Sequence, residues 1–140
     1  MWTSLISNKK QWTSIFGDKY TPKSLNISYA IFKDNSITLK LYAPIEENKR
    51  PKKWLNNGHN EYEFELLFNQ VCNVKISNFS FYGPIHIDIT NNENQNDIHI
   101  EINSYCKLAC TAQRISAINV KAYHNDNSAQ SYNSSIEFQN

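Results

Sequence analysis

The residues best suited to chemistry in this sequence are two histidines and two carboxylates, spread over two segments that alternate with isoleucine. They are His86, Asp88, His99 and Glu101. A hairpin register with Ile87 opposite Ile100 would set one histidine against one carboxylate in each of two cross-strand pairs on one exposed face. Imidazole and carboxylate groups bind metal ions and serve as general acids or bases, so one hypothesis is a metal-dependent hydrolase. The alternative is a solvated face of paired charges that needs no ligand.

A second group of residues with possible function is a basic cluster followed by a tryptophan. It consists of Lys49, Arg50, Pro51, Lys52 and Lys53, with Trp54 next in the chain. Such cations could contact phosphates while the indole stacks on a base, as in single-stranded nucleic-acid binders. The cluster is short, however, and the net charge of the chain is only +1. We therefore favour a polar connection that anchors itself through Trp54, and we predict no nucleic-acid partner.

Three glutamates form the third group. Glu61, Glu63 and Glu65 alternate with large apolar residues, so a strand here would display them outward, about 7 Å apart. Such a row is either solvated surface or a contact for a basic protein. We predict that a protein partner is contacted by this row and by the basic residues Lys49, Arg50, Lys52 and Lys53.

Other chemistry is poorly represented in this chain. The three glycines, Gly17, Gly58 and Gly83, are isolated, so no glycine-rich loop can cradle a phosphate. No serine or cysteine has the neighbours of a nucleophile elbow or a cysteine protease. Three cysteines make an odd count, which indicates reduced, buried thiols rather than a disulfide framework. We predict that the protein is not an enzyme, with no catalytic residue, bound metal or cofactor.

Length and composition favour a single domain. The chain has 140 residues, of which 40% are hydrophobic, enough for one core. The amino terminus lacks the apolar core of a signal peptide, and no segment is apolar enough for a membrane span, so we predict a soluble cytoplasmic protein with no membrane partner. The core is expected over residues 8–124. Residues 125–140 are expected to form a loose tail, apart from a possible last strand through Ile136 and Phe138.

The elements that must position these residues are mostly strands. A short helix is predicted after a cap at Ser7 and Asn8, with Trp12 and Phe16 facing the core and Gly17 ending it. Beyond it, apolar residues alternate with polar ones in about eight segments. These are residues 25–31, 37–41, 62–68, 72–76, 85–89, 98–102, 106–110 and 118–122. The pattern predicts a mainly β fold, an antiparallel meander that forms a curved sheet, a sandwich or an open barrel.

Two turns and one irregularity complete this pattern. Asp34 and Asn35 have the chemistry to close a first hairpin, and the Asn-rich residues 91–96 close a second. The alternation slips by one position around Ser77 and Asn78, which predicts a bulge or a strand break there.

Several short motifs in this chain resemble those of a known family. They are Trp12-Thr13-Ser14-Ile15-Phe16-Gly17, Pro22, Pro51-Lys52-Lys53-Trp54, Gly58-His59-Asn60, and Phe68 with Val71, Val74, Ile76 and Phe79. From about Trp12 to Tyr123 the chain resembles the immunity protein 50 family, small bacterial proteins linked to polymorphic toxin systems. The resemblance implies a protein, monomeric or homodimeric, that binds and neutralises a cognate toxin inside the producing cell. It transfers no catalytic role, and it implies that Trp54, Gly58 and Asn60 define the fold.

Overall fold

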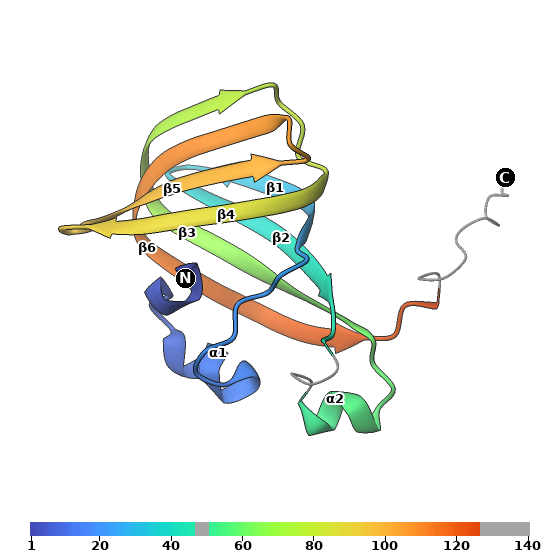
Figure 1. Ribbon diagram of the computed structural model, residues 1–140. Helices are drawn as coiled ribbons and strands as arrows, with labels where there is room; N and C mark the ends of the chain where they lie inside the picture. The colour runs from blue at the N-terminus through green and yellow to red at the C-terminus, as the bar shows by residue number, and fades with distance from the viewer. Residues whose placement is uncertain (47–50, 127–140) are drawn as a thin grey trace, which may run out of the picture.

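Six strands form one antiparallel sheet in the computed structural model, which describes residues 1–46 and 51–126. They are β1 (Asn26–Lys33), β2 (Ser36–Pro44), β3 (Glu61–Ser77), β4 (Gly83–Asn92), β5 (Gln95–Ile102) and β6 (Cys106–Tyr123). The order across the sheet is β1-β2-β3-β6-β5-β4, and a short ladder between β1 and β4 closes the sheet into a ring (Figure 1). The predicted mainly β antiparallel fold with a short N-terminal helix is confirmed, in the form of one strongly curved sheet.

The predicted number of strands, about eight, was wrong because two long strands each combine two of the predicted segments. β3 joins residues 62–68 to 72–76, and β6 joins 106–110 to 118–122. In β3, Phe68 and Val71 both pack on the core although three positions separate them, and Gln70 between them has a φ of 53°. The partners of these residues in β6, Ile115 and Ala112, are likewise both buried although three positions apart. In the sequence of one strand alone, a bend of this kind therefore looks like the end of one strand and the start of another.

The first strand also departs from its simple alternation. Leu25, Ile27, Tyr29 and Ile31 were predicted to share one buried side. A register shift between Ile27 and Tyr29 instead turns Tyr29 and Ile31 outward, where they are 46% and 49% exposed. The predicted irregularity near Ser77 is confirmed, because β3 ends at Ser77 and Asn78 has a φ of 56°.

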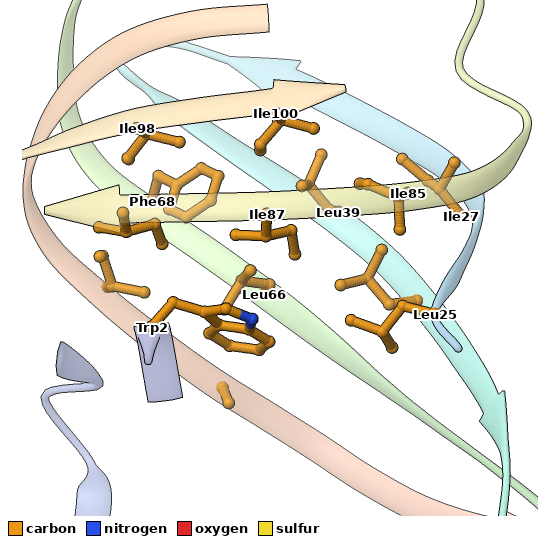
Figure 2. Packing of buried hydrophobic residues seen from close by; sticks show 14 of the residues in the cluster. Trp2, Leu25, Ile27, Leu39, Leu66, Phe68, Ile85, Ile87, Ile98 and Ile100 are labelled. Carbon is orange, nitrogen blue, oxygen red and sulfur yellow. The ribbon is translucent and has the colours of Figure 1, made fainter. Parts of the chain in front are cut away.

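The core fills the inside of the ring. Figure 2 shows isoleucines of β4 and β5 pointing toward Leu39, Leu66 and Phe68 of β2 and β3 on the opposite wall. Because one face of each strand is buried against the other side of the ring, the opposite face of the same strand is left as outer surface. The polar residues that alternate with these isoleucines therefore lie outside the ring.

The predicted N-terminal helix is present as α1 (Lys9–Phe16), and Gly17, with a φ of 86°, follows its last residue. Trp12 is almost fully buried in an aromatic cluster at one end of the ring. The predicted side-chain cap is absent. Asn8 instead reaches β6, where its Nδ2 donates to the Ala117 carbonyl at 2.6 Å and its Oδ1 accepts from the Ala117 amide at 3.1 Å. Asn8 thus satisfies the free backbone edge of β6 and holds α1 against the sheet.

Substituting this asparagine should cost stability. Asn8→Ala is expected to lower the free energy of unfolding by about 1–2 kcal/mol, since it leaves both Ala117 backbone groups without their partner. Urea denaturation followed by tryptophan fluorescence measures the change. Gln11→Ala serves as the control, because Gln11 is exposed and, within residues 1–46 and 51–126, its side chain bonds only to Asn8 itself. A loss for Asn8→Ala no larger than that of the control would contradict the proposed clamp.

The three cysteines differ in exposure. Cys106 and Cys110 are buried as predicted, but Cys72 is exposed, so the prediction of three buried thiols was wrong. Burial raises the pKa of the Cys110 thiol to about 11, which leaves little reactive thiolate near neutral pH. In a thiol titration of native protein at pH 8, we expect one cysteine, Cys72, to react quickly and the other two only after denaturant is added. Loss of the fast phase in Cys72→Ser would confirm the assignment, and fast reaction of all three thiols would contradict it.

Candidate functional site

The acidic row lies on the outer face of β3 as predicted, but its charges are already paired. The Lys40 Nζ lies 2.8 Å from the Glu63 carboxylate, and this hydrogen bond raises the pKa of Lys40. Asn119 donates to Glu65 at 3.0 Å, and the Tyr123 hydroxyl donates to Glu61 at 2.6 Å. The pKa of Tyr123 is raised by burial and by this bond. The row therefore contributes to the cross-strand contacts of β2, β3 and β6.

The basic cluster is only partly visible. Lys49 and Arg50 lie outside the described residues, while Lys52 and Lys53 are exposed on the one-turn helix α2 (Lys52–Asn56), which replaces part of the predicted loop. Trp54 anchors this helix as predicted, with its ring stacked on Tyr62 at 5.7 Å and edge-on to Phe16 at 5.6 Å. Because one face of its ring is stacked on Tyr62, that face is not free to stack on a nucleic-acid base.

The end of the ring at α1 and α2 is closed by aromatic rings. Trp12, Phe16, Tyr20 and Tyr62 form a continuous set of contacts there, and the Tyr20 and Tyr62 hydroxyls lie 2.7 Å apart. Burial raises the pKa of both tyrosines, so both hydroxyls are protonated at neutral pH and can share this hydrogen bond. Trp12, Phe16 and Trp54, which belong to the sequence motifs described above, therefore have a structural role in this aromatic cluster.

The two histidines and two carboxylates of the second hairpin lie where the sequence predicts. The register of β4 and β5 pairs Ile87 with Ile100, His86 with Glu101 and Asp88 with His99. All four side chains line a hollow of about 540 Å³ on the outer surface. Within residues 1–46 and 51–126, no three or more His, Cys, Asp or Glu side chains are grouped so that they could hold a metal ion. The metal-dependent hydrolase hypothesis therefore gains no ligand set from the described structure.

The hollow also includes residues from two other strands, which reasoning from the sequence missed. β6 contributes Lys107 and Ala109, and β3 contributes Lys75 and Ser77. Lys107 and Ala109 pair with Glu101 and His99 of the neighbouring strand β5. Lys75 and Ser77 join them only through the pairing of β3 with β6, a long-range contact for which local alternation gives no signal. The hollow therefore combines the predicted face with a basic side from elsewhere in the chain.

Comparison with known protein families assigns the chain. A sequence model described as Immunity protein 50 matches residues 8–123, which is most of the chain. The chain belongs to the immunity protein 50 family. No curated protein and no solved structure matches it. The family resemblance drawn from the sequence motifs is thus confirmed. In this immunity protein 50 family member, the matched region contains all six strands of the described structure.

None of the helices formed by residues 1–46 and 51–126 combines the length and the apolar character needed to cross a bilayer.

Proposed function

We propose that this protein binds a cognate bacterial toxin and neutralises it by forming a stoichiometric complex in the cytoplasm of the producing cell. The observation that carries the proposal is membership of the immunity protein 50 family over residues 8–123. A role of this kind needs a stable surface and no reactive group. A ring-shaped sheet suits it, because the interior supplies rigidity while the outer faces of the strands present side chains to a partner.

The working part in this proposal is the outer surface, and the protein is neither an enzyme nor dependent on a cofactor. The acidic row of Glu61, Glu63 and Glu65 and the exposed Lys52 and Lys53 stay proposed toxin contacts. Use of the row would require the toxin to compete with its present partners, such as Lys40. Contacts of this type mainly increase the rate of association and the specificity.

The test is protection and binding measured with the toxin encoded beside this gene. Coexpression should restore growth of cells that produce the toxin, and a purified, catalytically inactive toxin should form a complex of defined stoichiometry in calorimetry and size-exclusion chromatography. Phe64→Ala serves as a destabilised control that should protect less well. Absence of both growth rescue and complex formation would overturn the proposal.

A further inference from the structure

Two complete rows of side chains cross the outer face of four strands. The register places His86, Glu101, Lys107 and Ser77 side by side on β4, β5, β6 and β3. The next row on the same strands consists of Asp88, His99, Ala109 and Lys75. These eight residues alternate with buried positions such as Ile87 and Ile100, so their side chains lie outside the ring. They surround the hollow of about 540 Å³.

Alanine at position 109 creates the depth of this hollow. Ala109 is flanked in its row by His99 on β5 and Lys75 on β3, both with long side chains. In an antiparallel sheet, cross-strand neighbours lie about 5 Å apart, so the short alanine leaves a gap between two long side chains. The floor is therefore apolar and the rim is charged.

The charges around the rim are separated by strand. Asp88 and Glu101 lie on β4 and β5, while Lys107 and Lys75 lie on β6 and β3. The centres of the two pairs are two strand spacings apart, roughly 10 Å. One side of the hollow is acidic and the other basic, with two histidines on the acidic side.

Among the residues that the structure describes, these charged groups have no side-chain partner. Within the described part of the chain, none of the six titratable side chains around the hollow makes a hydrogen bond or an ion pair. The glutamates of the acidic row on β3, in contrast, all have partners. Because charges that are free to pair can meet those of a partner without breaking existing bonds, the hollow suits recognition better than the acidic row does.

We infer that this hollow receives a projecting segment of the toxin that carries a basic and an acidic side chain, the basic one over Asp88 and Glu101 and the acidic one over Lys75 and Lys107. The inference rests on the proposed function. Charge complementarity specifies the occupant, since only a segment with both signs at a spacing of roughly 10 Å matches both sides of the rim.

The exposure of the hollow favours a protein over a small molecule. Most of its charged side chains are exposed, so the site cannot enclose the greater part of a small ligand, as typical ligand pockets do. Its Ser77 and Lys107 end also continues into exposed aromatic residues. The Asn78 side chain donates to the Tyr105 carbonyl at 3.3 Å, and Phe79 and Tyr105 are 74% and 57% exposed. Aromatic side chains beside charged groups are typical of protein interfaces, which need about 800 Å² from each partner.

The test measures the affinity of purified variants for the catalytically inactive toxin encoded beside this gene. Ala109→Trp fills the hollow, and Asp88→Lys reverses a charge on its acidic side. Each is expected to weaken binding by about tenfold or more, and Asp88→Lys should also lower the association rate. Glu93→Lys is the matched control, because it makes the same change of charge in the turn of the same hairpin, and it should bind within about twofold of the wild type. Glu65→Gln tests the acidic row in parallel.

The outcomes separate the two proposals. If the wild type binds the toxin but Ala109→Trp and Asp88→Lys bind equally well, the inference about the hollow is wrong and the proposed function stands. If the wild type neither binds nor protects, the proposed function fails and the inference fails with it. Circular dichroism and thermal melting confirm that each variant is folded, and Asp88→Lys, at an exposed position, keeps the test decisive if Ala109→Trp does not fold. A loss of binding caused only by Glu65→Gln would assign the contact to the acidic row instead.

Discussion

Replacing Phe64 with alanine is expected to lower the free energy of unfolding by about 3–5 kcal/mol. Phe64 on β3 has no exposed surface. Its ring lies 5.2 Å from Trp12 of α1 in an edge-on contact and 6.5 Å from Trp2 in a stacked one. Trp2 begins a short 3₁₀ helix, η1 (Trp2–Leu5), so Phe64 joins both N-terminal helices to the sheet. Truncation removes both contacts and leaves a cavity that rigid neighbouring rings cannot fill. Urea denaturation of the variant and the wild type measures the loss.

Two further variants distinguish this packing effect from a general sensitivity of the fold. Tyr29→Ala removes an aromatic ring that is 46% exposed on the outer face, and it is expected to change the free energy of unfolding by no more than about 0.5 kcal/mol. Phe64→Leu keeps most of the volume and should cost less than Phe64→Ala. Equal losses for Phe64→Ala and Tyr29→Ala would show that the aromatic cluster does not hold the helices to the sheet.

The second hairpin shows how much of the fold local sequence can predict. Isoleucines at every second position in both segments specify which face of the hairpin is buried, since a slip by one residue would expose a whole face. The observed pairing of Ile87 with Ile100 is the register assumed from the sequence, and it keeps every isoleucine of the hairpin inside. Half of the hollow follows directly from this register.

The long strands show where such reasoning stops. Alternation changes phase at Gln70 in β3, and a bulge interrupts the pairing near Asn119 in β6, where φ is 55°. Asparagine tolerates positive φ better than most residues, so β6 bulges at Asn119 without ending. In the sequence of one segment, a shift in the alternation of apolar and polar residues looks the same whether the strand bends or a loop interrupts it. Only the pairing of β3 with β6, which is a long-range contact, distinguishes the two.

Only part of the candidate site could be predicted from the sequence, because the rest depends on long-range strand pairing. The histidines and carboxylates of the hollow lie on one hairpin, whereas Lys75 on β3 joins them only through β6. The acidic row was predicted to face outward and does, but its pairing with Lys40 depends on the register of β2 with β3. Sequence alone identifies charged outer faces, and the structure identifies which of these charges are free to meet a partner.

The closure of the ring is expected to depend on Gly83. Gly83 pairs with Ile27 in the short ladder between β1 and β4, and its φ is 107°, a conformation that side chains disfavour. A Cβ at this position would lie 3.3 Å from the Asn103 side chain, in the turn between β5 and β6. Gly83→Val is therefore expected to lower the free energy of unfolding by about 2–4 kcal/mol, through backbone strain and crowding together.

Gly58→Val separates these two causes. Gly58 also has a positive φ, 70°, but a Cβ there would meet no atom within 4 Å, so only the backbone strain applies and the loss should be smaller. Hydrogen exchange locates the effect. The Ile85 amide donates to the Leu25 carbonyl at 3.1 Å beside the β1–β4 ladder, and Gly83→Val should speed its exchange while Gly58→Val does not. Unchanged exchange at Ile85 in a destabilised Gly83→Val would mean that the ring is held shut by its core rather than by this two-pair ladder.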